Sequence, residues 1–164
     1  GTGKEIALAD QSTTEPVAKR VFPQAVYYGA NFEDPSFYVG KKYDMVICSD
    51  VIEHLANPDA LLAIIKNHLK GETGLAILST PDRELRWGKD KNQSPNKLHV
   101  RECSAAELQS YLTHSGFTIE GHTHFPLRRL SPLKFALSRL PFVYKNIKKA
   151  AWYPNQTWVI RLAK

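Results

Sequence analysis

The apolar residues of the chain fall into two kinds of pattern that alternate along the sequence. Residues 43–49 and 74–80 are continuous apolar runs, typical of strands that are buried on both faces. Between them, a helix is expected to begin at the capping pair Asn57–Pro58 and to end near Gly71. Its apolar positions recur with helical spacing at Leu61, Leu62, Ile64, Ile65 and Leu69. Strand, helix and strand in this order predict an α/β domain with a parallel sheet.

The N-terminal residues repeat this alternation. A short strand is expected at 5–10, a helix at 12–22 and another strand at 25–28. Ser12 and Glu15 stand at the spacing of a capping box, which satisfies free N–H groups in the first turn of a helix. These elements extend the predicted α/β pattern to the N-terminus.

The C-terminal part contains one helix and two strands. Ser104 and Glu107 repeat the capping-box spacing, and Gly116 is the expected end of the helix that they open. Strands are expected at 117–125 and 156–163. They flank a long stretch that is rich in basic residues.

Polar side chains stand at the carboxyl ends of the predicted strands. Asp10 ends the first strand, Ser49 and Asp50 follow the run at 43–49, and Thr80 ends the run at 74–80. In open α/β sheets, ligands bind beyond the carboxyl ends of the strands. These residues are therefore the first candidates for a binding site.

The composition fits one globular domain. The 164 residues are 43% hydrophobic and 23% charged, and no apolar run approaches the length of a membrane span. Two cysteines form no disulfide framework, and Cys48, within an apolar strand, is expected to be a small buried hydrophobe. The expected compartment is a reducing cytoplasm.

The net charge of +6 is concentrated in one segment. Residues 128–150 contain seven Lys and Arg residues and no acid, while the rest of the chain is close to neutral. The segment also contains many apolar residues, and Pro132 and Pro141 divide it. An amphipathic cap over an active site, a membrane-surface patch, a nucleic-acid contact and a solvated pair of basic helices all agree with this composition.

Two blocks of sequence resemble one enzyme family. Residues 43–82, YDMVICSDVIEHLANPDALLAIIKNHLKGETGLAILSTPD, are similar to the fourth strand, the following helix and the fifth strand of class I S-adenosylmethionine-dependent methyltransferases. Residues 99–121, HVRECSAAELQSYLTHSGFTIEG, are similar to that family's segment before its sixth strand. The resemblance is to small-molecule O-methyltransferases of the ubiquinone-biosynthesis and sugar-modifying type. It implies a Rossmann-like sheet with helices on both faces, S-adenosyl-L-methionine as cofactor, and a single domain over residues 1–164 with a basic, lid-like insertion at about 126–153.

The resemblance also implies roles for single residues. Asp10 matches the acid that accepts hydrogen bonds from both ribose hydroxyls, a task that suits a carboxylate; without the resemblance it reads as a turn or capping acid. Ser49 and Asp50 match positions that line the methionine side of the cofactor pocket. Asn31, next to Ala30, stands where the family usually has an Asp for the adenine amino group, and it is the candidate there.

The sequence departs from the family at its N-terminus. Only Gly1, Thr2 and Gly3 precede the part that matches the family's second strand, so the first strand and its glycine-rich loop are absent from it. The first strand lies in the centre of the family's sheet, and its loss leaves backbone groups of both neighbours unpaired. We therefore expect either an interruption of the chain near Gly3–Lys4 or a gap in the sheet where that strand belongs.

Asp50, Glu53 and His54 have the i, i+3, i+4 spacing of one helical face, and His99 is a fourth candidate for the same site. In one interpretation Glu53 and His54 only orient each other and the loop. In a second, His54 or His99 is the general base for the acceptor. In a third, the four residues bind a divalent metal, because they resemble the ligand set of RNA 3′-end 2′-O-methyltransferases. We expect these four residues not to converge on one point, and so predict no metal ligand. We also expect Asp50 and His54 to border the pocket, while Glu53 mainly supports the loop.

The resemblance therefore implies an O-methyltransferase that acts on a small molecule. An anionic or lipid-linked acceptor would match the charge of residues 128–150. The resemblance favours a substrate lid for this segment. Binding of the segment to a membrane surface remains an alternative, and a nucleic-acid partner is disfavoured. Two rivals remain: a metal-assisted RNA 2′-O-methyltransferase and a non-catalytic methyltransferase-like interaction module. No motif predicts the oligomeric state.

Overall fold

A computed structural model of the chain describes residues 5–89, 96–126 and 154–164. The basic segment at 128–150, and with it the predicted lid, lies outside the described residues. Residues 1–4, where an interruption of the chain is one of the two expectations, lie outside them as well.

The N-terminal elements form a small parallel pair of strands. Strands β1 (Ala7–Asp10) and β2 (Val26–Gly29) are joined by a 3₁₀ turn, η1 (Ser12–Thr14), and by helix α1 (Glu15–Val21). The predicted capping box is wrong, because no side chain caps the start of η1 or of α1. The chain enters α1 through the 3₁₀ turn, so the two box residues do not flank one helix start.

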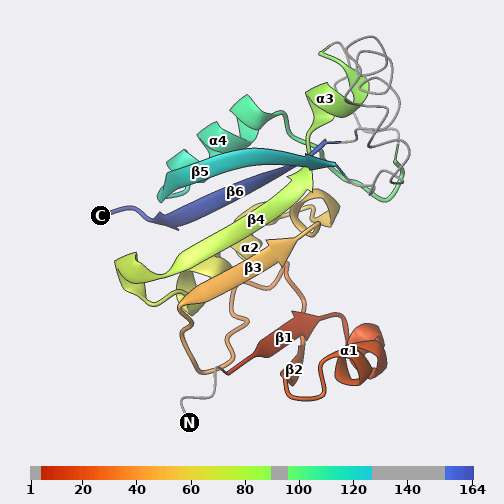
Figure 1. The fold of residues 1–164 in the computed structure, drawn as a ribbon, viewed down its shortest axis with the longest axis vertical. Coiled ribbons are helices and arrows are strands. Elements are labelled where there is room, and N and C mark those ends of the chain that lie inside the picture. Colours follow the sequence, from red (N-terminus) through yellow and green to blue (C-terminus); the bar gives the residue numbers. More distant parts are fainter. Residues whose placement is uncertain (1–4, 90–95, 127–153) are drawn as a thin grey trace, which may run out of the picture.

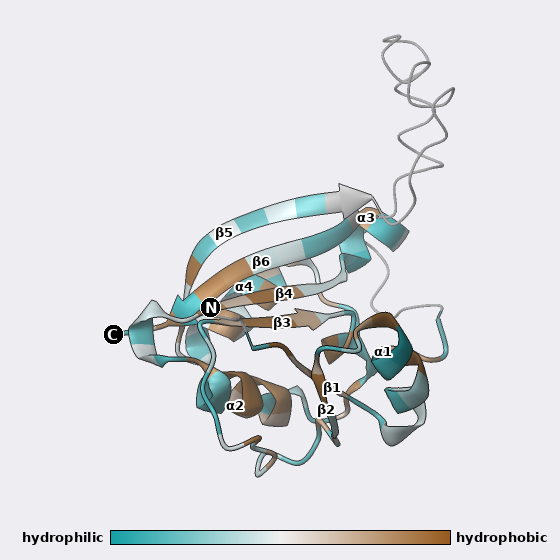
Figure 2. Cartoon of the chain, turned by 60° about the horizontal axis from the view of Figure 1, so that its bottom comes forward, coloured by the Kyte–Doolittle hydropathy of each residue, from teal (hydrophilic) through white to brown (hydrophobic). Residues whose placement is uncertain are grey.

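The larger sheet has four strands in the order β3-β4-β6-β5 (Figure 1). Strands β3 (Met45–Ser49) and β4 (Leu75–Pro81) pair in parallel, so their carboxyl ends meet at one edge. Strands β6 (Pro154–Leu162) and β5 (Phe117–Pro126) continue the sheet in antiparallel pairing. Figure 2 shows β3 and β4 as mostly hydrophobic strands, as the continuous apolar runs predict. The predicted α/β fold is confirmed.

Helices α2 (Pro58–His68) and α4 (Ala105–His114) pack on one face of the larger sheet (Figure 1). Cys48 lies in the core beneath them, as predicted, and burial raises the pKa of its thiol to about 12. The core formed by these helices and strands includes Leu61, Ile65, Leu78, Leu108, Leu112, Trp158 and Ile160. In the described part of the chain, no helix is long and apolar enough to cross a membrane.

The ends of the helices follow the sequence signals in part. The capping box of Ser104 and Glu107 is present at the start of α4, and Gly116 follows the helix with a φ of +80°. Pro58 is the first residue of α2, as predicted, but the Asn57 side chain makes no capping hydrogen bond. Three short elements complete the described chain: η2 (Ile52–His54), η3 (Gly71–Thr73) and α3 (Arg83–Trp87).

The two sheets are separate, because β1 and β3 are not hydrogen-bonded to each other. A cavity of about 740 Å³ lies between them, lined by residues 5–10 on one side and 45–50 on the other. Ile47 in β3 is 67% exposed, which is unusual for an isoleucine inside a sheet. In the described residues, a gap therefore separates β1 from β3.

Candidate functional site

Polar residues at the ends of β1 and β3 line the same cavity. Asp10, Ser49 and Asp50 all line the cavity of about 740 Å³ between the two sheets. That volume lies within the range of pockets that hold cofactors and drug-sized molecules, about 300–1,000 Å³. The structure thus brings together three of the four residues that the resemblance assigns to the cofactor.

The fourth residue, Asn31, does not line this cavity. Its side chain is in an exposed turn after β2, where Oδ1 accepts a hydrogen bond from the Glu33 N–H at 3.1 Å. The next residue, Phe32, does line the cavity. Sequence reasoning missed this aromatic side chain, although it stands directly beside the predicted contact.

Asp10 has spare capacity to accept hydrogen bonds. Its Oδ1 accepts a hydrogen bond from the N–H of Gln11 at 2.7 Å, and the residue is exposed at the carboxyl end of β1. A carboxylate offers about four lone-pair sites. Two hydroxyl donors can therefore bind Asp10 without displacing its contact with Gln11.

Asp50 has an unusual backbone conformation. Its φ is +53°, in the left-handed region that costs a residue other than glycine about 1–2 kcal/mol. Two hydrogen bonds hold it there: its N–H donates to the Ser79 carbonyl at 2.9 Å, and its Oδ1 accepts from Asn155 Nδ2 at 2.6 Å. The conformation turns the chain away from β3 directly at the cavity. Strained residues of this kind cluster at functional sites.

The turn after Asp50 brings an acid and two histidines together. One ligand atom each from Glu53, His54 and His99 all lie within 4.8 Å of one another. The rings of His54 and His99 stand edge to face with centroids 4.8 Å apart. Asp50 is outside this group, so the four residues do not converge as a set, but three of them do. The expectation that there would be no convergence is therefore only partly met.

Each imidazole is held through its Nδ1 atom. His54 Nδ1 donates to the carbonyl oxygen of Leu98 at 2.8 Å, and His99 Nδ1 donates to Glu102 Oε1 at 2.5 Å. Both acceptors require a proton on Nδ1, so each neutral ring has its lone pair on Nε2. Glu102 is buried and also accepts from Trp87 Nε1 at 2.7 Å. Sequence reasoning missed Glu102, although it stands three residues after His99 in the quoted block.

Glu53 is a buried carboxylate that ties the turn to its surroundings. It is only 2% exposed, and its Oε2 accepts from Thr80 Oγ1 at 2.8 Å. Its backbone carbonyl accepts the N–H of Arg101 at 3.1 Å, which fixes the segment that contains His99. Burial raises the pKa of the Glu53 carboxyl. These contacts agree with the predicted role of Glu53 in supporting the loop.

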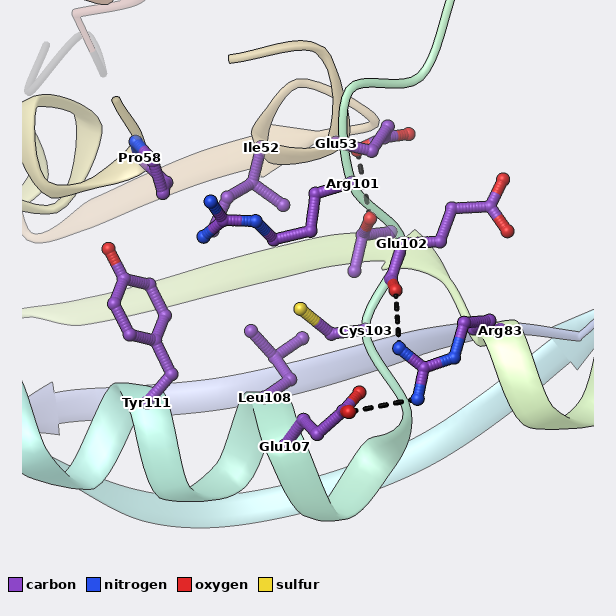
Figure 3. Close-up of a pocket in the computed structure, with 11 residues that line it drawn as sticks. Ile52, Glu53, Pro58, Arg83, Arg101, Glu102, Cys103, Glu107, Leu108 and Tyr111 are labelled. Carbon is purple, nitrogen blue, oxygen red and sulfur yellow. Dashed lines mark hydrogen bonds and ion pairs between the residues drawn. The ribbon is translucent and has the colours of Figure 1, made fainter. Parts of the chain in front are cut away.

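A second cavity, of about 250 Å³, is lined in part by Ile52 and Glu53 of this turn (Figure 3). Figure 3 shows Arg101 reaching across it toward Tyr111 of α4, with Cys103 at its floor. His54 lines neither of these two cavities. The prediction that His54 borders the cofactor pocket is therefore wrong, because its ring turns instead toward Leu98 and His99.

Comparison with known proteins gives one family. A family model described as a methyltransferase domain matches residues 3–122. No curated protein sequence matches the chain.

Solved structures share the fold at low sequence identity. A S-adenosylmethionine-dependent methyltransferase from Clostridium acetobutylicum has a TM-score of 0.65 and 11% identity, over 98% of this chain and 76% of that one. A glycopeptide N-methyltransferase in complex with S-adenosyl-L-methionine has a TM-score of 0.62 and 15% identity, over 98% and 73%. The N-methyltransferase NodS from Bradyrhizobium japonicum, in complex with S-adenosyl-L-homocysteine, has a TM-score of 0.63 and 10% identity, over 98% and 67%. The predicted Rossmann-like architecture is confirmed by these likenesses.

Proposed function

Since the chain belongs to the methyltransferase-domain family, we propose that it transfers a methyl group from S-adenosyl-L-methionine to a hydroxyl oxygen of a small molecule. The observation that carries this proposal is the meeting of Asp10, Ser49 and Asp50 on one cavity of about 740 Å³. Two solved structures with this fold contain the cofactor or its demethylated form, which supports the same choice of cofactor.

The residues on the cavity wall suit the parts of this cofactor. Asp10 can accept hydrogen bonds from two ribose hydroxyls, because only one of its oxygens is engaged by Gln11. Ser49 and Asp50 are polar groups for the charged amino-acid end. For the adenine, Phe32 on the cavity wall offers an apolar surface. Asn31, which precedes it but lies outside the cavity lining, is the polar candidate. When bound, the cofactor supplies an electrophilic methyl group on a sulfonium sulfur.

We assign the role of general base to His54 or His99. Each ring has its Nε2 lone pair free of the hydrogen bond that holds Nδ1. A positioned imidazole that takes a proton contributes about 10²–10⁴ in rate. The Glu102 carboxylate at His99 Nδ1 stabilises the imidazolium that forms when this ring takes a proton, in the manner of the acid in a catalytic triad.

The acceptor is proposed to be anionic or lipid-linked. The basic segment at 128–150 lies between Pro126 and Pro154, which pair with each other at the ends of β5 and β6. Asn155, the next residue of β6, contacts Asp50. The segment is thus attached at the edge of the sheet that bears the cofactor residues. This attachment supports its role as a lid whose positive charge attracts an anionic acceptor.

We also propose that one further parallel strand fills the gap between β1 and β3 and carries the glycine-rich loop of the cofactor site. Both facing strands already pair in parallel on their other sides. The cavity between them runs along residues 5–10 and 45–50, and its wall is largely apolar. The proposal is supported by this geometry and by the position of the gap, which lies between the two strands that the family separates by its first strand.

The test is cofactor binding followed by product analysis. Calorimetry with S-adenosyl-L-homocysteine should give saturable binding, and mass spectrometry should find a mass gain of one methyl group in a hydroxylated acceptor. A panel should include phenols, sugars, lipid-linked phenols, amines and short RNAs. Methylation of amines or RNA alone would overturn the choice of acceptor. Absence of cofactor binding by a chain that includes the strand proposed to fill the gap would favour a non-catalytic module.

A further inference from the structure

One carboxylate and two imidazoles face one another in the turn that follows β3. We propose that Glu53, His54 and His99 form a binding site for one divalent first-row transition-metal cation, and that the open side of this cation holds the oxygen of the methyl acceptor. One ligand atom from each residue lies within 4.8 Å of the other two. The inference rests on the proposed function, because the acceptor oxygen is the atom that the cation would hold.

Both imidazoles are oriented as metal ligands usually are. A metal-binding histidine almost always donates its second ring N–H to a carboxylate or a backbone carbonyl, which fixes the ring and leaves the other nitrogen for the metal. His54 donates Nδ1–H to the Leu98 carbonyl at 2.8 Å. His99 donates Nδ1–H to the Glu102 carboxylate at 2.5 Å. Both rings are therefore held through Nδ1, and their Nε2 atoms are the ones left for a metal. The two rings stand edge to face.

The third ligand is a carboxylate that forms no ion pair with the other residues that the structure describes. Glu53 is 2% exposed and accepts one hydrogen bond from Thr80 at 2.8 Å. A buried carboxylate is costly unless it is paired or binds a metal. A cation between Glu53 and the two imidazoles would compensate its charge.

The donor set selects the class of cation. Two imidazole nitrogens and one carboxylate oxygen favour Mn²⁺, Fe²⁺, Co²⁺ or Zn²⁺, whereas Mg²⁺ and Ca²⁺ prefer oxygen ligands. Three protein ligands leave further positions open, as in catalytic sites. Bonds of about 2.1 Å bring ligand atoms to roughly 3–4 Å from one another. The present limit of 4.8 Å therefore requires only a small inward movement of the side chains.

The open side of the site is exposed to solvent. His54 is exposed, whereas Glu53 is buried and His99 is half-buried. A hydroxyl that binds the cation there has a lowered pKa and loses its proton to water. Its oxygen then forms the O–CH₃ bond as the S–CH₃ bond breaks, and the electron pair of that bond stays on sulfur. With the cation bound, neither imidazole is needed as the base.

The first measurement is binding of the metal alone. The full chain, freed of metal with EDTA and dialysed, is titrated with Co²⁺ while the visible absorption bands of the ion are recorded. We expect saturation at one equivalent. His54→Ala and Glu53→Gln should each abolish this saturable signal, while His114→Ala, an exposed histidine on α4, should leave it unchanged. Glu102→Gln should weaken binding by about 10- to 100-fold, as expected for a group that orients a ligand.

The outcomes separate the cation site from the proposed function. A lack of saturable Co²⁺ binding, or binding that persists in both His54→Ala and Glu53→Gln, would overturn the site. If Co²⁺ binds but methyl transfer is equally fast in EDTA, the role of the cation in transfer is wrong and an imidazole base remains. If Co²⁺ binds and no hydroxyl acceptor is methylated with Mn²⁺ or Co²⁺ present, the proposed O-methylation is at fault and the cation site stands. His54 is exposed, so His54→Ala tests the site without loss of the core.

Discussion

The side-chain amide of Asn155 donates a hydrogen bond to Asp50 Oδ1 at 2.6 Å, across 105 positions of sequence. Asn155 is the second residue of β6, and it is paired with Pro81 at the carboxyl end of β4. Asp50 follows β3 and has a φ of +53°. The contact therefore joins three strands at the edge where the proposed cofactor binds, and it holds a strained residue in place.

Asn155→Ala should weaken cofactor binding more than it weakens the fold. It removes the donor to Asp50, and a hydrogen bond to a charged group contributes about 1.5–3 kcal/mol, or roughly 10- to 150-fold in affinity if all of it is lost. Part of this is recovered by water, so we expect a loss of about 5- to 20-fold in affinity for S-adenosyl-L-homocysteine. Calorimetry measures the change. Thr157→Ala, two residues along the same strand, is the matched control.

Asp10→Ala should cost more cofactor affinity than any other change at the end of β1. A carboxylate that accepts two ribose hydroxyls contributes charge-assisted hydrogen bonds, so the loss should be about 2–3 kcal/mol, or roughly 30- to 150-fold. Asp34→Ala is the control, because this exposed acid only holds a turn through Ser36. Equal affinity of the Asp10→Ala protein and the parent chain would contradict the ribose assignment.

His54→Ala and His99→Ala, assayed in EDTA, should identify the imidazole base. Replacement of the true base should lower kcat by about 10²–10⁴, with little change in KM. The variant that lacks the other histidine should keep the kcat of the parent chain. An unchanged kcat in both variants would exclude both rings as the base.

The ion pair of Glu107 with Arg83 should make the stability depend on pH. Arg83 Nη2 donates to Glu107 Oε1 at 2.8 Å, and this contact is the main reason that the pKa of the Glu107 carboxyl is lowered. A carboxyl with a lowered pKa in the folded state stabilises the fold above its usual pKa, and this contribution is lost as the pH falls through the lowered value.

Glu107→Gln isolates that charge, because glutamine can still complete the capping box with Ser104. The Glu107 side chain is 51% exposed, so solvent screening limits the loss to about 0.5 kcal/mol at pH 7. The difference from the parent chain should shrink as the pH falls below the ordinary glutamate pKa of about 4.3, and it should vanish only below the lowered pKa of Glu107 in the folded state. Urea denaturation at several pH values measures it, with Glu72→Gln on the exposed turn η3 as control. A difference that persists in acid would contradict the electrostatic origin.

The capping boxes show which parts of the fold can be predicted from sequence. The box at Ser104 forms as predicted, because both partners and the backbone groups they satisfy lie within four residues. The box at Ser12 does not form, because a 3₁₀ turn precedes α1 and the same spacing no longer spans one helix start. Local signals thus predict an element, while its first turn depends on how the chain enters it.

The candidate site divides in the same way. Asp10, Ser49 and Asp50 could be placed on one cavity because parallel strands bring their carboxyl ends to one edge. The contact of Asn155 with Asp50 could not, since a hydrogen bond across 105 positions has no local pattern. The spacing of Asp50, Glu53 and His54 suggested one helical face, but Asp50 lies outside the helical turn with a positive φ, so only the last two meet His99.

The gap between β1 and β3 gives the last prediction. Among the described residues each of these strands is paired on one side only, so we expect the backbone N–H groups that face the gap to be open to water. In hydrogen exchange followed by NMR, alternate amides of β3, those not paired with β4, should exchange at least about 100-fold faster than the amides of β4, which is paired on both sides.

A chain extended at its N-terminus by a strand that fills the gap should slow exchange at those alternate amides of β3 and at the facing amides of β1, while β4 changes little. The alternate amides matter because parallel pairing directs successive N–H groups of a strand to opposite sides, so the paired half of β3 serves as an internal control. Ile47, now 67% exposed, should also become buried in the extended chain. Slow exchange at all amides of β3 in the chain that begins at Gly1 would show that the two sheets close on each other in solution, and the cavity would then have no room for a further strand.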